Sequence, residues 1–346
     1  MKAIVKKEAA RGLVMTDVPE PTPGIGEVKI RPLITSVCGT DLHIYKWDEW
    51  AAQTIRTPQI IGHEFVGVVE EVGPGANGVK VGQRIVGEGH FTCGVCRNCR
   101  EGNRHLCSKT EGLGVQRPGC FAEHFCLPAE NLFPIPDTVP NEVAAIFDPF
   151  GNAVHTALEF NPLGEDVLIT GAGPIGLMAT LVVRHAGARS ITVTDVSPHR
   201  LEMAKKFGAT RLVNVAEQSL ESVCGVEGKR DIFGIGLEMS GVASALNSML
   251  RVMRPGGSIA LLGILPDGIG ICWSDVIFRS LTLRGIYGRK IFKTWYQMSH
   301  LIEGGLDLSP VITHRFAADD FESAFQTMLE GRCGKVLLDW TGSAQS

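Results

Sequence analysis

Three features are scarce in this sequence, and each absence excludes a class of protein. The longest apolar stretch, Val167–Val183, is interrupted by three glycines and a proline, whereas a membrane-spanning helix normally needs ~20 consecutive apolar residues. The N-terminal segment has no apolar core of signal-peptide length, so we expect no export. The formal net charge of −4 leaves no basic excess, which argues against a nucleic-acid partner. We therefore expect a chain that acts on a small molecule, with neither a membrane nor a nucleic acid as its partner.

Glycine and cysteine, by contrast, are plentiful. The length of 346 residues suggests about two domains of ~100–200 residues each. The 41 glycines indicate many tight turns and a ligand site lined by backbone. Ten cysteines without an export signal favour reduced thiols and metal ligation over disulfides.

The pattern of apolar residues changes near Phe150. Before it, β-rich runs such as Glu27–Ile34 and Phe65–Val72 are separated by Gly/Pro turns. After it, strand and helix patterns alternate, which predicts βαβ units and a parallel, doubly wound sheet, so the fold class is α/β. The predicted strands are Asp166–Thr170, Ser190–Asp195, Arg211–Val215, Ile232–Glu238, Ser258–Gly263 and Leu281–Ile286, and the predicted helices include Pro174–His185 and Pro198–Phe207. Helices near Trp295–Glu303 and Asp320–Glu330 and a strand over Lys335–Trp340 then return the chain to the first domain.

A cysteine-rich segment over about residues 88–114 has no periodicity. This pattern predicts a loop that needs a cross-link to hold it in one conformation. Its spacing is C-x2-C-x2-C-x7-C, formed by Cys93, Cys96, Cys99 and Cys107. Thiolates two residues apart in a tight turn can converge on one ion, and a fourth completes a tetrahedron. Iron–sulfur clusters use similar spacings, but no proline follows Cys107 and only one such group exists. We expect a closed structural zinc site that contributes order and no chemistry.

A second candidate metal site is scattered along the chain. Cys38 ends an apolar run, and His63 and Glu64 directly precede a predicted strand. A mixed sulfur, nitrogen and oxygen set with room for an exchangeable ligand is typical of a catalytic zinc. Each residue alone is more often an ordinary buried or surface group, so the hypothesis gains its weight from the neighbouring cysteine segment and the nucleotide fold.

Thr40 and His43 follow Cys38 closely. A hydroxyl and an imidazole beside a metal-bound alcohol can carry its proton out to water. Equally, Thr40 can be a helix cap and His43 a solvated loop residue, and the sequence leaves both interpretations open.

A dinucleotide motif opens the second domain. Gly171, Gly173 and Gly176, with Ile175 between them, fit G-x-G-x-x-G after a predicted strand and before a predicted helix. Asp195 ends the next strand about 20 residues later, where a carboxylate binds ribose hydroxyls and repels a 2′-phosphate. This favours NAD over NADP, although Arg200 nearby could either stack beside adenine or accept a phosphate.

Two apolar turns end later strands of the same predicted sheet. They consist of Leu262, Gly263 and Ile264, and of Ile286 and Tyr287. Ligands of this fold lie at the carboxyl ends of the strands, so both turns could line the nicotinamide, or they could simply be strand-end packing.

The sequence resembles the zinc-dependent medium-chain alcohol dehydrogenases over essentially its whole length. The matching motifs are Cys38-Gly39-Thr40-Asp41 with His43, Gly62-His63-Glu64, the four-cysteine segment, and the Gly171–Gly176 turn with Asp195. The resemblance implies a β-rich, GroES-like catalytic domain of residues 1–149 and 290–346. It also implies a Rossmann NAD-binding domain of residues 150–289.

The resemblance implies roles for individual residues as well. Cys38, His63 and Glu64 would hold a catalytic zinc and the four cysteines a structural one, giving two zinc ions per chain. Thr40 and His43 would form the proton relay, and Asp148 would lie close to the metal without being a firm ligand. Relatives carry a second cysteine or a glutamate near Asp148, so the fourth ligand stays open. The residues that would contact NAD are Ile175, Asp195, Arg200, Leu262–Ile264, Ile286 and Tyr287.

Three softer segments, Phe147–His155, Gly285–Arg289 and Ile312–Phe316, resemble the branch of this family that oxidises L-threonine. They imply NAD-dependent oxidation of the 3-hydroxyl to 2-amino-3-oxobutanoate by a cytoplasmic homotetramer. Candidates to bind the substrate ammonium and carboxylate are His90, Trp47, Trp50 and Arg289. One alternative is a dehydrogenase of a polyol or secondary alcohol, such as sorbitol or 2,3-butanediol. A non-catalytic zinc or nucleotide-binding protein is the other, and the acidic charge opposes it.

Overall fold

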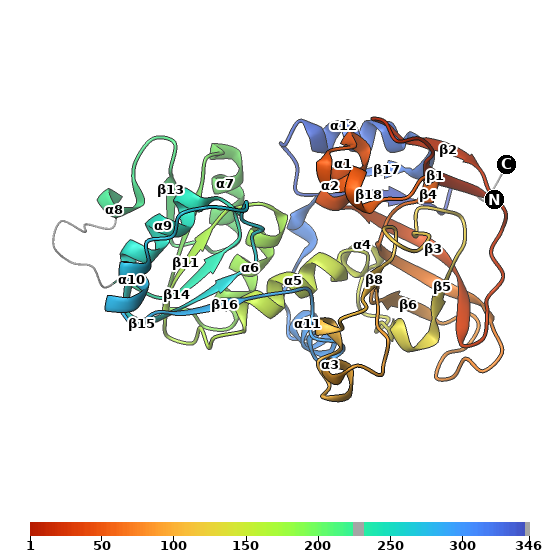
Figure 1. The fold of residues 1–346 in the computed structure, drawn as a ribbon, viewed down its shortest axis with the longest axis horizontal. Helices are drawn as coiled ribbons and strands as arrows, with labels where there is room; N and C mark the ends of the chain where they lie inside the picture. Colours follow the sequence, from red (N-terminus) through yellow and green to blue (C-terminus); the bar gives the residue numbers. More distant parts are fainter. Residues whose placement is uncertain (224–231, 343–346) are drawn as a thin grey trace. The chain divides into compact units, whose positions relative to one another are not determined.

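The computed structural model describes residues 1–223 and 232–342, which form two compact units (Figure 1). One unit comprises Met1–Pro149 with Lys290–Ser346, and the other comprises Phe150–Arg289. Across the described residues, no helix combines the length and the apolar character that crossing a membrane requires.

The first unit is built on a mostly antiparallel sheet with strand order β10-β6-β5-β3-β18-β17, and β9 pairs with β3 off this path. Its strands are β3 (Glu27–Val37), β5 (Glu64–Val72), β6 (Arg84–Gly87), β9 (Phe125–Pro128), β10 (Leu132–Pro134), β17 (Ile312–Ala317) and β18 (Lys335–Asp339). A smaller sheet contains β1 (Lys2–Lys6), β2 (Val14–Asp17) and β4 (Gln59–Ile60), and a third pairs β7 (His90–Phe91) with β8 (Glu111–Gly112). The C-terminal strand β18 lies antiparallel to β3, with Leu337 opposite Ser36.

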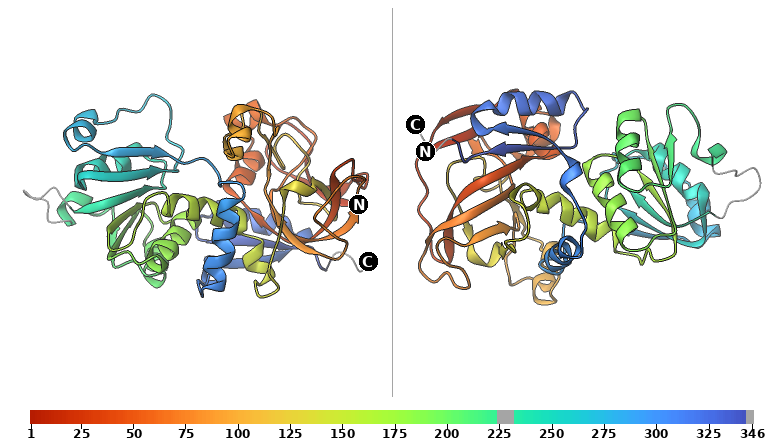
Figure 2. Two further views of the ribbon diagram at one scale, coloured as in Figure 1. Left: turned by 90° about the horizontal axis from the view of Figure 1, so that it is seen from below. Right: turned by 180° about the vertical axis from the view of Figure 1, so that it is seen from behind.

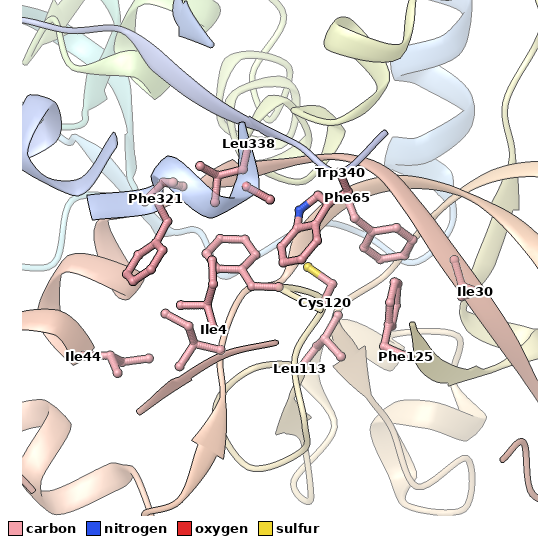
Figure 3. Packing of buried hydrophobic residues seen from close by; sticks show 14 of the residues in the cluster. Ile4, Ile30, Ile44, Phe65, Leu113, Cys120, Phe125, Phe321, Leu338 and Trp340 are labelled. Carbon is pink, nitrogen blue, oxygen red and sulfur yellow. The ribbon is translucent and has the colours of Figure 1, made fainter. Parts of the chain in front are cut away.

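The hydrophobic core of this unit joins segments from both ends of the chain. Ile4 from β1, Ile30 from β3 and Phe65 from β5 gather in one cluster with Phe321 and Leu338 from the C-terminal segment (Figure 3). Each buried side chain of this size stabilises the fold by roughly 1.5–3 kcal/mol. The core therefore fixes β3, β5 and β18 against one another, and these are the strands that carry the metal-site residues.

The first unit contains more helix than the sequence pattern predicted. Its helices are α1 (Gly39–Lys46), α2 (Glu49–Thr54), α3 (Arg97–Arg100), α4 (Asn141–Ala144), α11 (Lys293–Glu303) and α12 (Phe321–Leu329), and its 3₁₀ turns are η1 (Arg104–Leu106), η2 (Ala129–Asn131), η3 (Ser309–Val311) and η4 (Ala318–Asp320). Helix α5 (Phe147–Ala157) carries the chain into the second unit. The short helices α1 to α4 lack the apolar repeat over several turns that identifies a helix. The cysteine-rich segment is therefore not all loop, because it holds α3, η1 and the β7–β8 pair.

The second unit is a six-stranded parallel sheet with order β13-β12-β11-β14-β15-β16. Its strands are β11 (Asp166–Thr170), β12 (Ser190–Asp195), β13 (Arg211–Asn214), β14 (Phe233–Glu238), β15 (Met253–Leu261) and β16 (Thr282–Gly285), and its helices are α6 (Pro174–His185), α7 (Pro198–Lys206), α8 (Leu220–Val223), α9 (Ala243–Val252) and α10 (Trp273–Phe278). The strand order reverses at β11, so right-handed crossovers put α6 and α7 on one face and α9 on the other (Figure 2). The predicted α/β, doubly wound fold is confirmed.

Three predicted strands of this sheet are one residue too long at one or both ends, because β13 ends at Asn214, β14 begins at Phe233 and β16 covers Thr282–Gly285. A fourth differs by more. We predicted Ser258–Gly263, whereas β15 begins at Met253 and ends at Leu261. The strand ends early because Leu262 and Gly263 turn to donate their backbone N–H groups to the carbonyl of Glu238, at 2.9 and 3.0 Å.

Candidate active site

The residues of the scattered metal site come together in the first unit. Cys38 is the N-cap of α1, directly after β3, and His63 and Glu64 stand at the start of β5. Because β3 and β5 pair with Ser36 opposite Glu64, the two strand ends lie side by side. One ligand atom from each of Cys38, His63 and Glu64 lies within 4.8 Å of the others.

Gly62 makes the turn into this site possible. Its φ is +92°, and a Cβ there would lie 2.1 Å from the Phe121 ring. Only glycine satisfies both the left-handed backbone and the contact with a buried aromatic ring. The motif Gly62-His63-Glu64 therefore needs its glycine for geometry, and its other two residues are candidate metal ligands.

Glu64 is fully buried, and its two carboxylate oxygens have different surroundings. Its Oε2 accepts a hydrogen bond of 2.5 Å from Nζ of Lys335, which also donates to the carbonyl of Val37 at 3.0 Å. Burial alone would lower the pKa of Lys335, but the charges of Glu64 and Cys38 outweigh it and raise the pKa. Oε1 of Glu64 has no hydrogen-bond partner among the described residues. A buried carboxylate oxygen without a partner is costly, and a metal ion would supply the missing partner.

Asp41 supports the other two ligands. Its Oδ2 accepts the backbone N–H of Cys38 at 2.8 Å, and its Oδ1 lies 3.9 Å from Nδ1 of His63. Burial raises the pKa of Asp41 to about 6. Burial would lower the pKa of His63, but the charges of Cys38 and Asp41 raise it to about 10. The site thus strongly favours a positive charge at its centre, and its donor set fits zinc.

Thr40, His43 and Asp148 do not belong to this cluster of candidate ligands. Oγ1 of Thr40 lies 3.9 Å from Sγ of Cys38. His43 stands one turn further along α1, with a side chain that is 57% exposed and a ring Nδ1 hydrogen-bonded to the carboxylate of Asp48. Asp148, nearly buried near the start of α5, helps to raise the pKa of His63, so its carboxylate lies within electrostatic reach of the site.

Another buried carboxylate, that of Glu88, lies in the segment that passes His63. A Cβ on Gly89 would lie 3.7 Å from Cβ of His63. Next to it, Oε1 of Glu88 bonds Nδ1 of His90 at 2.7 Å, and Oε2 accepts from Nε1 of Trp295 at 3.2 Å. Glu88 thereby fixes the orientation of the partly exposed His90 ring, which directly follows the glycine that passes His63.

The four cysteines of the second metal motif also converge, and we call this group the thiolate lobe. Cys93, Cys96, Cys99 and Cys107 each offer a sulfur within 4.8 Å of the others. Backbone N–H groups point at the sulfurs, for example from Cys93 and Lys109 to Sγ of Cys107, both at 3.3 Å. Backbone hydrogen bonds from Cys99 and Ser108 lower the pKa of Cys96 to about 6. Such N–H bonds favour thiolates, the form that binds zinc.

The glycine-rich turn between β11 and α6 has the shape that a dinucleotide requires. Gly173 is the N-cap of α6, and nothing lies within 4 Å of a Cβ placed on it, so the backbone there is open to a ligand. A Cβ on Gly176 would lie 2.0 Å from the carbonyl oxygen of Gly171, so only glycine permits this close packing. Backbone N–H groups at such a helix start suit a pyrophosphate, and the residues fit a bound dinucleotide.

Asp195 ends β12 beside this turn. Its Oδ2 accepts the N–H of Ala172 at 2.7 Å and its Oδ1 that of Ser197 at 2.8 Å. Ser197 caps α7, and Arg200 lies in the first turn of that helix. Both oxygens of the Asp195 carboxylate are therefore held by backbone N–H groups, one of them in the glycine turn and the other at the start of α7.

The remaining predicted cofactor residues follow β15 and β16 at the same edge of the sheet. In register, Thr194, Thr170, Glu238, Leu261 and Gly285 form one row across the sheet. Ile264 is 94% exposed and Tyr287 55% exposed, whereas Ile286 is buried. The structure thus brings these turns and the glycine turn to one edge.

Three charged residues of these sites were missed by sequence reasoning. Asp41 stands inside a quoted motif, but nothing in the sequence shows which groups it contacts. Lys335 is 271 positions from Glu64, and Glu88 is 207 positions from Trp295. Only a lysine or glutamate inside an otherwise apolar run could have indicated such a buried partner.

Comparison with known proteins identifies the class. Residues 24–137 match the alcohol dehydrogenase GroES-like domain and residues 174–304 match the zinc-binding dehydrogenase domain. The chain belongs to this family of zinc-binding dehydrogenases. The predicted enzyme class and the predicted pairing of a GroES-like with a Rossmann domain are thereby confirmed.

Individual proteins of known activity or structure are similar to the chain over nearly its whole length. L-threonine 3-dehydrogenases from Idiomarina loihiensis and Pseudoalteromonas translucida are 55% and 56% identical, over 98% of this chain and 100% of theirs. The crystal structure of a short chain alcohol dehydrogenase (rspB) from E. coli with bound NADH is similar, with a TM-score of 0.90 and 28% identity, covering 98% of this chain and 99% of that chain. 2R,3R-butanediol dehydrogenase from Bacillus subtilis has a TM-score of 0.86 and 26% identity, covering 98% of this chain and 99% of that chain.

Proposed function

We propose that this chain catalyses the NAD-dependent oxidation of the 3-hydroxyl of L-threonine to 2-amino-3-oxobutanoate. The observation that carries the proposal is the combination of an open Cys38/His63/Glu64 site with relatives of that activity aligned over 98% of the chain. The polyol and secondary-alcohol alternative has support only from more distant structural neighbours.

In this proposal Cys38, His63 and Glu64 hold the catalytic zinc, and the thiolate lobe holds a structural one. A bound zinc supplies Lewis acidity that lowers the pKa of the substrate hydroxyl, and NAD accepts the hydride. Asp41 orients the ligands, because it contacts both the backbone of Cys38 and the ring of His63. Lys335 orients Glu64 and balances its charge.

Thr40 and His43 form the proton path. They are three residues apart on α1, a spacing that puts both side chains on one face of a helix. The Thr40 hydroxyl lies beside the metal ligand Cys38, whereas His43 is mostly exposed. The hydrogen bond to Asp48 holds Nδ1 of His43, which leaves Nε2 to exchange a proton with water. Asp148 assists through its charge.

The cofactor site is the edge formed by the glycine turn, Asp195 and the two later turns. The α6 N-terminus binds the pyrophosphate, and Asp195 binds the adenosine ribose and disfavours a 2′-phosphate. The residues in this site are Gly171, Gly173, Ile175, Gly176, Asp195, Arg200, Leu262, Gly263, Ile264, Ile286 and Tyr287.

Of the candidates for the charged ends of threonine, His90 has the best support. It directly follows Gly89, whose backbone passes His63, and its ring is oriented by Glu88. Trp47 packs against the amine of Lys6, 4.9 Å from its ring centroid, and Arg289 is only 2% exposed and bonds Asn152. Trp50 lies at the edge of the His43 ring.

We also propose a cytoplasmic homotetramer. The edge strand β16 has an unpaired side among the described residues, and Ile264, Ile277 and Phe278 of the same unit are more than two-thirds exposed. An open strand edge with nearby apolar side chains is suited to pairing with another copy. The nine cysteines described by the structure are all free thiols, in keeping with a reducing compartment.

The test is NADH formation at 340 nm by zinc-loaded protein. L-threonine, sorbitol, 2,3-butanediol and simple alcohols would be compared, each with NAD and with NADP. We expect the highest kcat/KM for L-threonine with NAD. A preference for a polyol or diol would contradict the proposed substrate and leave the zinc and cofactor sites standing.

A further inference from the structure

Glu238 is a fully buried carboxylate that neither metal site uses. It is the last residue of β14, in the interior of the parallel sheet, and is 0% exposed. Among the described residues no lysine, arginine or histidine forms an ion pair with it. Burying a carboxylate is costly unless its oxygens accept hydrogen bonds, so its partners indicate what the carboxylate is for.

The partners of Glu238 are neutral donors from two neighbouring strand ends. Its Oε1 accepts from the backbone N–H groups of Ser240 at 3.0 Å and Gly241 at 3.1 Å. It also bonds the hydroxyls of Ser240 and of Thr170, the latter at 3.3 Å. Thr170 is the last residue of β11 and directly precedes Gly171. One carboxylate therefore ties the turn after β14 to the start of the glycine turn.

The main chain of the same residue holds a third turn. The carbonyl of Glu238 accepts the N–H groups of Leu262 and Gly263. A Cβ on Gly263 would lie 2.4 Å from Oε2 of Glu238, and one on Gly241 would lie 2.7 Å from the carbonyl oxygen of Ile264. The turns after β11, β14 and β15 thus meet around Glu238, with their backbones in contact. None of the three turns can shift unless Glu238 shifts with it.

Two of these three turns belong to the proposed cofactor site, so this inference rests on the proposed function. We propose that Glu238 is a positioning residue for the dinucleotide, because its carboxylate fixes the relative placement of the glycine turn, the 239–241 turn and the 262–264 turn. Its negative charge further favours the oxidised cofactor, since the nicotinamide ring is positively charged in NAD⁺ and loses that charge when it accepts a hydride.

The experiment compares Glu238→Gln with the unaltered chain in equilibrium binding. NADH binding is followed by its fluorescence and NAD⁺ binding by calorimetry, on zinc-loaded protein whose metal content and Tm are also measured. We expect the Kd for NADH to rise about threefold and the Kd for NAD⁺ to rise about tenfold, because bonds are weakened in both complexes and a charge attraction is lost in only one. The KM for the alcohol substrate should not change.

Glu165→Gln is the matched control. Glu165 stands just before β11 at the opposite, amino-terminal edge of the same sheet, where it pairs with Arg254. This variant removes the same charge from the same unit, and both Kd values should stay within about twofold of the unaltered chain.

Unchanged Kd values for both cofactor forms in a folded Glu238→Gln protein would overturn the proposal. An equal rise for both forms would overturn the charge effect and keep the positioning role. If Glu238→Gln does not fold, Thr170→Val and Ser240→Ala each remove one hydrogen bond to the Glu238 carboxylate and keep its charge. Ser240→Ala also removes the bond that this hydroxyl accepts from the N–H of Val242, so Thr170→Val is the cleaner of the two variants. They should weaken both forms equally, by about twofold to threefold, and no weakening in either would overturn the positioning role.

The outcome is separable from that of the proposed function. An unaltered chain that binds NAD(H) but does not oxidise threonine contradicts only the substrate, and the Glu238 comparison remains valid. An unaltered chain that binds neither cofactor form contradicts the cofactor assignment itself.

Discussion

The two proposed metal sites of this chain are built in opposite ways. The ligands of the thiolate lobe all lie between Cys93 and Cys107, and two of its four cysteines are partly exposed. The ligands of the open site come from the ends of two different strands, and the charge of Glu64 is balanced by Lys335, 271 positions away. One site is a property of a short segment, and the other is a property of the folded domain.

This contrast supports the proposed roles of the two sites, one structural and one catalytic. Four thiolates saturate a tetrahedral ion, so the lobe gains order from its metal and offers no position for a substrate. The open site has three ligands, and its charges are held by groups such as Lys335 and Asp41 that are already fixed in the core. A rigid, charged, three-ligand site binds a cation and still has a position for a reacting hydroxyl.

The largest effect is expected from removing a ligand of the open site. Cys38→Ser should lower kcat/KM for L-threonine by at least about 10⁴-fold, because the Lewis acid is lost. The zinc content should fall from two ions to one per chain, as measured by elemental analysis, with the lobe metal retained.

Cys272→Ser is the control for this substitution. Cys272 belongs to neither metal site, and its sulfur already lies 3.4 Å from the hydroxyl of Ser274, so serine suits its surroundings. This variant should keep both zinc ions and full activity. Full activity in Cys38→Ser, on the other hand, would disprove the assignment of the catalytic site.

Breaking the buried ion pair should have the next largest effect. Lys335→Met leaves Glu64 buried without its partner, which costs about 3–5 kcal/mol when nothing else compensates. Bound zinc does compensate. We therefore expect the free energy of unfolding to fall by most of this amount in the metal-free protein and by much less in the zinc-bound protein. Urea unfolding with and without a chelator measures the difference, and Lys335→Arg serves as the charge-preserving control. Equal losses in both forms would show that Lys335 acts on the fold and not on the metal site.

A smaller effect is expected from the proton path. His43→Ala should lower kcat by about 10²-fold, the usual contribution of a positioned proton carrier, and flatten its pH dependence. Zinc content and the affinity for NADH should not change, because the ring of His43 lies outside the ligand cluster. His185→Ala, a change of the same kind on α6 of the other unit, provides the control. A turnover in His43→Ala equal to that of this control would show that His43 is not part of the proton path.

The smallest effect, counted per pH unit, is expected in zinc loading at the open site. In the metal-free protein burial lowers the pKa of His63, but Cys38 and Asp41 raise it to about 10 from an ordinary 6.5. Protonation of His63 therefore stabilises the metal-free fold fully below pH 6.5, and this stabilisation is lost as the pH rises through 10. Zinc must displace that proton, so its affinity should rise about tenfold per pH unit between about pH 6.5 and 8.5. Competition with a fluorescent chelator measures the slope, and a pH-independent affinity would show that His63 is not a ligand.

The same contrast, between sites whose residues are close in sequence and sites whose residues are far apart, determined what the sequence could predict. The thiolate lobe and the Gly171–Gly176 turn were predictable because their functional groups are close in sequence and their spacing reflects geometry. The strand Asp166–Thr170 and the helix Pro174–His185 match the structure at both ends, since glycine and proline mark their boundaries. Helix α1 was not predicted, because its eight residues give no clear apolar repeat.

Buried charges between distant segments could not be predicted. Lys335 begins a strand that is apolar between its two end residues, and nothing nearby in sequence shows that its amine meets Glu64. Glu238 ends a strand in the same way, and its role depends on three turns that only the parallel sheet brings together. Pairings of this kind follow from topology, which a single sequence specifies only through the fold.

The measurement that tests this account most directly is stepwise removal of zinc by a chelator, with metal content, threonine oxidation and Tm followed in parallel. The account predicts that the three-ligand site loses its ion first, that activity falls in proportion to this first ion, and that Tm falls mainly with the second. Activity that persists until the second ion leaves, or a single step in which both ions and the fold are lost together, would contradict the division between a catalytic and a structural site.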